Sequence, residues 1–426
     1  MLTAWIQWLS SRTLGELLLI AWPLLCVDGL RYGLATVVMC LADAVRDVVD
    51  WLRDGPASQE EFRPPICVVL AGLNEADTIG ATLESVWGSY APMEIIVVDD
   101  GSTDGMADVA KKFAQDHPGV MVIRKPQRGG KSSALNCALP FAKAPILVCV
   151  DTDSHVEPGA IERIVQPFRD PRVAAASGAV VARNANTSLL TRLQAAEYLR
   201  SVFVGRLLSS RLGVLSIVSG AFGAYRRSAL ERTGGWDVGP GEDGDLVLRL
   251  RKGGWQVRHV PLAQCLTNLP TKWRQLFKQR RRWEWAAVTF ECRKHLDLAN
   301  VRSPGFRLSN LAILAETWFF RILLTYLAAA SMVVMAVCWP GWFVYALLTN
   351  YALCVLLELA QWMVVMFYTP KPARDAWALL CVPLMPAYFL FIKAASLVAY
   401  TEEFFWRRSY RDTFVPAHVS RRTWQW

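Results

Sequence analysis

Four short polar motifs in this chain combine residue types that bind nucleotides, hold metal ions and move protons. They are Val97-Val98-Asp99-Asp100-Gly101-Ser102, Val150-Asp151-Thr152-Asp153, Gly241-Glu242-Asp243 and Gln279-Arg280-Arg281-Arg282-Trp283. Each motif alone is ambiguous, because acidic and basic pairs are common on solvated surfaces. Four of them in this order, in a chain that also carries long apolar runs, indicate one site with a nucleotide pocket, a metal pair, a base and a clamp for a diphosphate.

Asp99 and Asp100 end a β-rich run, where carboxylates accept hydrogen bonds from a base or ribose and Gly101 allows the backbone to approach closely. A turn with a helix cap explains this motif equally well. Asn74 and Glu75 follow the first expected strand, and we expect them to flank the same base.

Lys131 follows two glycines at the expected start of a helix, which is a favourable place for an anion. The glycine spacing of a Walker A loop is missing, so an ATPase is disfavoured. Asp151 and Asp153 end the most hydrophobic strand and can share Mg²⁺ or Mn²⁺, whose charge would neutralise a departing diphosphate. The alternative is that both acids are solvated loop residues. His155 follows closely, but a lone histidine is more often a polar surface residue than a site residue.

Glu242 and Asp243 stand at the expected N-terminus of a helix, where acidic residues are also good caps. As a general base, one of these carboxylates would take the proton from an attacking hydroxyl. Direct displacement with one base inverts the anomeric carbon, so an α-linked donor would give a β-linkage. Asp245 is the next candidate if the pair has only a structural role.

The Gln279-to-Trp283 motif lies on an expected interfacial helix, where at least one of three adjacent arginines must face the protein. A guanidinium fork matches phosphate oxygens, and Trp283 or Trp285 offers a flat face to a sugar ring. A basic helix on anionic lipid is the alternative. Ser219 and Gly220 are small, as is required where an acceptor chain slides past the backbone. A tight structural turn explains them equally well.

Alternating segments place these motifs at strand ends. Expected strands cover residues 66–70, 94–98, 120–123, 146–150 and 173–176, and expected helices cover 77–88, 107–117, 131–141 and 158–168. This alternation predicts an α/β domain with a mostly parallel, Rossmann-like sheet whose ligands bind at the carboxyl ends of the strands.

Composition indicates a membrane protein. The 426 residues are 53% hydrophobic with a mean hydropathy of +0.24, above the usual range of soluble domains. One tilted span is expected near residues 14–42, after an interfacial helix over 1–13, and three more near 318–339, 341–367 and 376–400. Asn350, Glu358 and Gln361 interrupt the second of these three, where polar residues usually face protein or a water-filled path.

The net charge of +9 comes without a nucleic-acid motif, so anionic lipid and a nucleotide diphosphate are the expected partners rather than nucleic acid. Ten cysteines without paired spacing indicate reduced thiols, and no cleavable signal peptide is expected. If the catalytic domain is cytoplasmic, one span before it and three spans after it place both ends of the chain outside. The positive-inside rule instead predicts that the basic C-terminal tail stays inside. Either the last segment, interrupted by Pro383, Pro386 and Lys393, turns back, or the first is a hairpin.

These motifs resemble the membrane-embedded processive family 2 glycosyltransferases, which include hyaluronan, chitin, cellulose and poly-N-acetylglucosamine synthases. The Q-x-x-R-W element, here Gln279, Arg282 and Trp283, is the most specific part. The resemblance implies a GT-A domain with Asp99 and Asp100 at uridine, Asp151 and Asp153 at diphosphate and metal, Asp243 as base, Arg282 at the pyrophosphate and Trp283 under the acceptor sugar. The motif at Gly241 lacks the threonine of larger cellulose synthases, which slightly favours N-acetylglucosamine over glucose as the transferred sugar.

The expected organisation follows from these assignments: an interfacial and transmembrane segment (1–45), a linker (46–65), the GT-A domain (66–271), interface helices (272–315), spans (316–400) and a basic tail (401–426). The expected function is elongation of a β-linked exopolysaccharide from a UDP-sugar at the inner membrane, coupled to translocation, with accessory export or regulatory subunits as further partners. Two alternatives stay open: a non-processive polyprenyl-phosphate transferase, and a non-catalytic export component that binds nucleotide.

Overall fold

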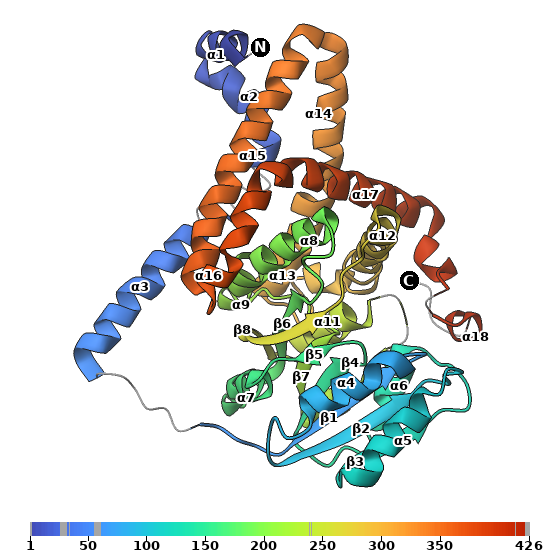
Figure 1. Ribbon diagram of the computed structural model, residues 1–426. Helices are drawn as coiled ribbons and strands as arrows, with labels where there is room; N and C mark the ends of the chain where they lie inside the picture. Colours follow the sequence, from blue (N-terminus) through green and yellow to red (C-terminus); the bar gives the residue numbers. More distant parts are fainter. Residues whose placement is uncertain are drawn as a thin grey trace.

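The computed structural model describes residues 2–25, 32–33, 35–54, 61–237, 239, 241–413 and 415–421. An eight-stranded sheet forms the centre of the membrane-distal part (Figure 1). Its strands are β1 Ile66–Gly72, β2 Met93–Asp99, β3 Val120–Arg124, β4 Ile146–Asp151, β5 His155–Val156, β6 Val173–Ala182, β7 Phe222–Arg226 and β8 Gln256–Thr267. The spatial order is β3-β2-β1-β4-β7-β6-β8-β5.

The sheet is mixed rather than mostly parallel. The first four strands pair in parallel, as the alternating pattern predicts, and β6 pairs with β8 in parallel. Strand β7 is antiparallel to both β4 and β6, and β5 is antiparallel to β8. The expectation is therefore wrong for the second half. β7 was missed because its five residues, FGAYR, contain no β-branched side chain.

Helices cover both faces of the sheet, and alternate residues of a strand enter different cores. In β1, Val68 and Leu70 pack in one core, whereas Cys67 and Val69 pack in the other. The helices and helical turns of this domain are α4 Ala76–Val86, α5 Met106–Asp116, α6 Lys131–Ala138, α7 Ala160–Val165, η2 Gln166–Arg169, α8 Leu189–Arg200, η3 Ser201–Arg206, α9 Leu207–Arg211, α10 Arg227–Thr233 and α11 Glu242–Lys252.

A second set of helices follows the sheet domain: α12 Trp273–Thr289, η4 Phe290–Lys294, η5 Leu296–Ala299, α13 Leu308–Ala315, η6 Glu316–Leu323, α14 Leu324–Cys338, α15 Pro340–Tyr368, α16 Pro372–Asp375, η7 Ala376–Leu384, α17 Met385–Trp406, η8 Arg408–Arg411 and α18 Ala417–Ser420. Among the described residues, three continuous helical stretches are long and apolar enough to cross a membrane: Leu308–Cys338, Pro340–Tyr368 and Pro372–Trp406. The first begins ten residues before the expected span.

The last of these stretches does not run alongside the other two. Figure 1 shows α14 and α15 upright, whereas α17 runs across the view at a steep angle to both and lies next to α12. The change of direction coincides with η7, a 3₁₀ segment with Pro383 inside it. The final segment thus changes direction at its Pro-containing interruption, and its path relative to the membrane stays a prediction.

The N-terminal region contains α1 Leu2–Ser10, α2 Leu14–Leu24 and α3 Ala35–Asp54. The expected single span over 14–42 includes residues 26–31 and 34, which lie outside the described residues. The expected linker over 46–65 needs correction, because α3 stays helical to Asp54. Apolar residues such as Val45 and Val49 recur there at helical spacing among charged ones, as in an amphipathic helix.

The polar residues of α15 join the sheet domain to the membrane helices. Glu358 and Gln361 are buried, and Arg200 at the end of α8 donates to their side chains at 2.5 and 3.3 Å. Asn350 donates to the Ile20 carbonyl of α2 at 3.0 Å. These residues were expected to face either protein or a water-filled path, and in the structure they contact protein.

Candidate active site

The carboxyl ends of three parallel strands meet at one edge of the sheet. Gly72 at the end of β1 is in register with Asp99 of β2, and Ala71 is in register with Asp151 of β4. A β-carbon on Gly72 would lie 2.4 Å from the Thr152 hydroxyl, so the backbone of β1 packs directly against the loop after β4. The sheet thus brings the first two acidic motifs together, as their positions in the sequence predict.

The loops after β1 and β2 are joined by Asn74. This residue has a left-handed backbone, with φ of 58°. Its N–H donates to Ser102 Oγ at 2.8 Å, and its Oδ1 accepts from the Thr103 N–H at 2.9 Å. The Ala76 N–H, at the start of α4, donates to Asp104 at 2.8 Å. Asn74 therefore fixes the shape of this edge, and Glu75 lies next to it.

Asp99 and Asp100 have different environments. Buried Asp99 accepts from the Ser102 N–H at 2.7 Å and lies 3.6 Å from Arg124 Nε. Asp100 accepts from the N–H groups of Gly129 and Gly130 at 2.9 and 2.7 Å, and from Lys125 Nζ. Both oxygens of Asp100 thus hold the turn that begins α6.

Lys131 in the first turn of α6 connects the two halves of the site. Its Nζ lies 2.5 Å from Asp151 Oδ1 and 3.1 Å from the Gly220 carbonyl. Burial lowers the pKa of Lys131, but the carboxylates of Asp151, Asp243 and Glu242 outweigh burial and raise that pKa above its usual value. The lysine is a fixed cation beside three acids from two motifs.

Asp151 and Asp153 form the expected carboxylate pair. Burial and the charge of Asp151 raise the pKa of Asp153, and burial and Asp153 also raise that of Glu75. Among the described residues, no group of three or more His, Cys, Asp and Glu side chains is arranged to hold a metal. A pair of hard oxygen donors fits Mg²⁺ or Mn²⁺ when diphosphate and water complete the shell.

The base motif starts α11. Gly241 has φ of 76°, and a β-carbon on it would lie 2.7 Å from Ala286 Cβ of α12. Burial, then Glu242, raises the pKa of Asp243 to about 8, against the lowering effect of Lys131. Asp243 is therefore the acid whose environment best suits proton transfer near neutral pH.

Asp245, the reserve candidate, has a structural environment. Its Oδ1 lies 2.6 Å from Lys294 Nζ and 2.8 Å from His295 Nε2, and its Oδ2 lies 2.8 Å from Arg249 Nε. Although burial opposes them, these contacts with His295, Arg249 and Lys294 hold the pKa of Asp245 well below its usual range. Such a carboxylate is a poor proton acceptor.

One face of α12 meets the base motif, and the two residues expected to form the clamp lie on this face. Ala286 packs against Gly241, and Phe290 packs against Gly241 and Gly244. Arg282 is four residues before Ala286, and Gln279 is three residues before Arg282, so both side chains belong to this face. The helix periodicity aims Gln279 and Arg282 towards the start of α11.

The two other arginines of the motif face different partners. Arg280 donates from both terminal nitrogens to Glu197 of α8, at 2.8 and 2.7 Å. Its guanidinium carbon also lies 4.5 Å from the Trp283 ring centroid. Arg281 lies 3.4 Å from Glu402. Arg280 thereby packs against the half-exposed Trp283.

The Ser219-Gly220 loop lies against the base and the lysine. A β-carbon on Gly220 would be 2.4 Å from Asp243 Oδ2 and 2.9 Å from Lys131 Nζ. The Ser219 N–H donates to Ser177 Oγ at 3.1 Å, and the Asp151 N–H donates to the Ala221 carbonyl at 3.2 Å. This loop is the point where Asp243, Lys131 and the Asp151 segment meet.

Arg206 was not predicted as a site residue. It ends the π-helical turn η3, and its Nη1 donates to Ser177 Oγ at 3.3 Å. Burial lowers the pKa of Arg206, while Tyr198 and Asp243 oppose this effect. In the described part of the chain it forms no salt bridge within 4.0 Å. The sequence offers one signal for this residue, a single arginine within the apolar run Val202-Phe-Val-Gly-Arg-Leu-Leu. In the structure this run contains a π-helical turn, a feature that is frequent at functional sites.

Comparison with known families gives this geometry its context. The model of the family described as glycosyltransferase-like family 2 matches residues 64–286, which is more than half of the chain and contains all four motifs. The chain belongs to this family. The expected GT-A-type fold and family 2 membership are thus confirmed, and the protein is a glycosyltransferase by family.

The family 2 chain also resembles curated polysaccharide synthases. It is 30% identical over 263 residues to a poly-β-1,6-N-acetyl-D-glucosamine synthase of Staphylococcus aureus, covering 61% of this chain and 63% of that protein. It is 31% identical over 221 residues to the protein of the same name from Staphylococcus epidermidis, covering 51% and 53%. The matches thus span less than two thirds of the length of these relatives.

A solved structure shares the fold of this family 2 glycosyltransferase. It is a mannosyltransferase from Pyrobaculum calidifontis in complex with GDP-Man and Mn²⁺. The TM-score is 0.56 with 19% sequence identity, and the match covers 91% of this chain and 99% of that one. The likeness extends through nearly the whole chain and concerns the fold.

Proposed function

We propose that this chain is an inverting, processive glycosyltransferase that elongates a β-linked polysaccharide from a UDP-sugar. The observation that carries the proposal is the convergence on Gly220 of Asp243, whose pKa is about 8, and Lys131, which also contacts Asp151. A base next to a diphosphate-binding cation is the pair that sugar transfer from a nucleotide donor requires.

The reaction assigns a task to each side chain. Asp243 accepts the proton of the acceptor hydroxyl, whose oxygen forms a bond to the anomeric carbon while the bond from that carbon to the diphosphate oxygen breaks. Lys131 and Arg282 donate hydrogen bonds to the departing UDP, which takes the electron pair. Glu242, beside the base, raises its pKa. Attack opposite the leaving group inverts the anomeric centre.

The donor side consists of Asn74, Glu75, Asp99, Asp100, Lys131, Asp151, Gln279 and Arg282. Asp151 and Asp153 would hold Mg²⁺ or Mn²⁺, which supplies positive charge for the diphosphate. The mannosyltransferase with the same fold is in complex with Mn²⁺, which supports a divalent ion here. Asp100 acts indirectly, because its oxygens hold the Gly129-Gly130 turn before Lys131.

The acceptor side consists of Trp283, Ser219, Gly220 and Arg206. Trp283 is half-exposed and held by Arg280, so a sugar ring can stack on it. Arg206 is linked through Ser177 to Ser219 and offers further hydrogen bonds to the acceptor. The chain sits in the inner membrane with the catalytic domain in the cytoplasm, where nucleotide sugars are found.

The names of the staphylococcal relatives favour UDP-N-acetylglucosamine as donor and a polymer as product. The decisive experiment incubates the purified full-length protein with Mg²⁺ or Mn²⁺ and a panel of donors, then sizes the product. The panel contains UDP-N-acetylglucosamine, UDP-glucose and GDP-mannose. We expect a long polymer and released UDP from the first. One sugar added to a polyprenyl phosphate, or donor binding without release of UDP, would favour the two alternatives.

A further inference from the structure

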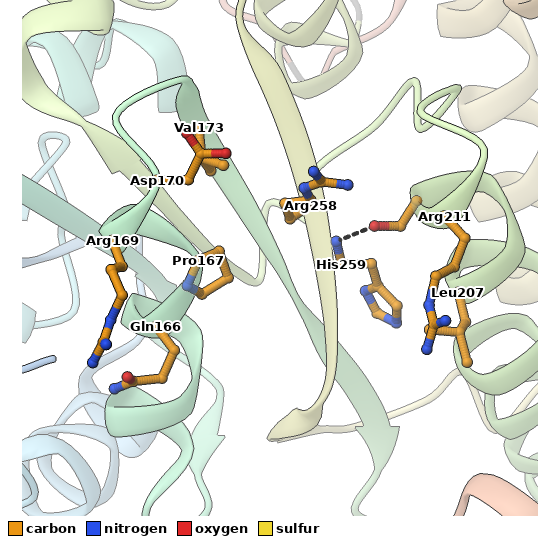
Figure 2. Close-up of a pocket in the computed structure, with 10 residues that line it drawn as sticks. Gln166, Pro167, Arg169, Asp170, Val173, Leu207, Arg211, Arg258 and His259 are labelled. Carbon is orange, nitrogen blue, oxygen red and sulfur yellow. Dashed lines mark hydrogen bonds between the residues drawn. The ribbon is translucent and has the colours of Figure 1, made fainter. Parts of the chain in front are cut away.

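A cavity with several arginines in its lining lies away from all four motifs. It has a volume of about 560 Å³ and opens between η2, α9 and β8 (Figure 2). Its walls are formed by Gln166, Pro167, Arg169, Asp170, Val173, Leu207, Ser210, Arg211, Arg258 and His259. This volume is within the range of small-molecule sites in proteins. None of these residues has a role in the proposed reaction.

The cavity is rich in arginine. Arg169, Arg211 and Arg258 come from three separate elements and line the same space. The one carboxylate in the lining, Asp170, accepts from the Arg172 side chain at 2.9 to 3.2 Å, outside the cavity wall. Arg258 donates to the neutral Gln256 amide at 2.7 Å. Positive charge thus exceeds negative charge in this lining, so the cavity attracts anions.

One wall of the cavity is tied to the end of a membrane helix. Arg211 lies 2.5 Å from Asp43 of α3, and the other oxygen of Asp43 accepts from Tyr368 at 2.6 Å. Tyr368 is the last residue of α15, one of the stretches long enough to cross a membrane. At 29 residues, α15 is longer than the roughly 20 residues that cross the hydrocarbon core, so its last turns reach the level of the headgroups. The cavity therefore sits at the height of lipid headgroups.

One buried lining residue, His259, has a polar atom without a hydrogen-bond partner among the described residues. His259 is 7% exposed, and its Nδ1 lies 3.0 Å from the Ser177 carbonyl, to which a ring N–H donates. The His259 N–H donates to Ser210 Oγ at 2.9 Å, as Figure 2 shows. Its Nε2 is buried and has no hydrogen-bond partner among the described residues. This nitrogen can accept a hydrogen bond from a hydroxyl group.

We propose that this cavity binds the phosphate of an anionic membrane lipid. Guanidinium forks on η2 and β8 match phosphate oxygens, while Pro167, Val173 and Leu207 offer apolar contacts to the glycerol end. A hydroxyl of the headgroup or a protonated phosphate oxygen would donate to His259 Nε2. A free phosphate ion has the same charge chemistry but neither the apolar part nor a reason to be held at the membrane surface. The site is independent of the proposed sugar transfer.

The test uses the full-length protein in uncharged maltoside micelles and isothermal titration calorimetry. The probes are dihexanoyl phosphatidic acid, dihexanoyl phosphatidylcholine and inorganic phosphate. We expect saturable binding of phosphatidic acid and binding at least about tenfold weaker for the other two, as expected when charge-assisted or apolar contacts are lost. Inorganic phosphate binding as tightly as phosphatidic acid would overturn the lipid assignment.

Variants locate the binding. Arg258→Gln and Arg169→Gln should each weaken phosphatidic acid binding about tenfold, and Arg258→Lys should restore part of it. Arg232→Gln is the matched control, because Arg232 is an exposed arginine of α10 that does not line the cavity. Arg169 is itself exposed, so its variant should fold even if Arg258→Gln does not. Equal weakening in Arg232→Gln, or none in Arg169→Gln, would show that binding is a general surface effect and would refute the site.

Discussion

Gly220 and Asp243 are packed so closely that a β-carbon on Gly220 would lie 2.4 Å from Oδ2 of Asp243. The carboxylate is thus held against backbone, where the Gly220 N–H lowers its pKa while burial raises it. The same β-carbon would be 2.9 Å from Lys131 Nζ, so one glycine positions the base relative to the cation. The sequence predicts a small residue here for the passage of an acceptor chain. In the structure, the missing side chain of Gly220 leaves room for the carboxylate of Asp243.

Gly220→Ala should displace Asp243 and lower turnover by about 10²-fold, the cost of misplacing a catalytic group by about 1 Å. Gly80→Ala is the control, because a β-carbon there meets only Val109, at 3.9 Å. Turnover of both variants is measured as UDP release. Wild-type turnover in Gly220→Ala would mean that Asp243 is not the group whose position limits the reaction.

Asp243→Asn should lower turnover by about 10²–10⁴-fold with nearly unchanged UDP affinity, because a positioned base contributes that much. The variant also has a stability signature. With a folded pKa of about 8 and an ordinary unfolded pKa near 4, the folded wild type binds more protons across this window, so its stability falls as pH rises from about 4 to 8. Relative to Asp243→Asn, the metal-free wild type should lose thermal stability over that range.

Asp245→Asn is the counterpart of this prediction. The folded pKa of Asp245 is lowered, so its charge stabilises the fold above the unfolded pKa of about 4 and is lost as pH falls further. Removing the charge beside Lys294, His295 and Arg249 should cost about 2 kcal/mol at neutral pH, with turnover retained per folded molecule. Melting curves and UDP release measure the two effects separately. Loss of turnover without loss of stability would return Asp245 to the list of candidate bases.

Prediction from sequence succeeded where a short segment defines its own environment. Runs such as Ile66-Cys-Val-Val-Leu become buried parallel strands, and acids at their ends meet at one edge because parallel strands share a direction. Assignments failed where partners lie far apart in the chain. Nothing near Asp100 reveals that Gly129 and Gly130 use its oxygens, and nothing near Glu358 reveals Arg200. Strand β7 and the Arg206 turn likewise depend on tertiary contacts rather than on local pattern.

Chelation with EDTA should abolish activity, and Asp153→Ala should weaken donor binding, because the diphosphate loses its counter-charge. Asp108→Ala is the control, since Asp108 is a highly exposed acid of α5. Donor affinity is measured with and without Mn²⁺. Asp153→Ala should bind the donor equally in both conditions, whereas the control should keep the wild-type gain from metal. A full gain from metal in Asp153→Ala would place the ion elsewhere.

Arg206→Gln should reduce the use of an added oligosaccharide acceptor while UDP binding stays close to wild type. The reason is that Arg206 contacts Ser177, which holds the Ser219 N–H, and offers its remaining donors to the acceptor. Ser177→Ala frees the same loop without removing the charge, so it separates loop support from direct contact. The KM for acceptor should rise more in Arg206→Gln than in Ser177→Ala. The reverse order would make Arg206 a support of the loop only.

Processivity is the property that separates a polymerase from a transferase that adds one sugar to a lipid phosphate. Trp283 should hold the acceptor sugar by stacking worth about 0.5–1.5 kcal/mol, whereas Arg282, on the helix face that meets Gly241, should hold the departing diphosphate. Trp283→Ala should therefore shorten or stop chain growth while UDP-sugar still binds, and Trp283→Phe should keep part of the length. Arg282→Ala should impair use of the donor itself. Product length and donor affinity, measured on the same preparations, distinguish the two roles. If the wild type adds one sugar to a polyprenyl phosphate and Trp283→Ala behaves identically, the polymerase assignment is wrong.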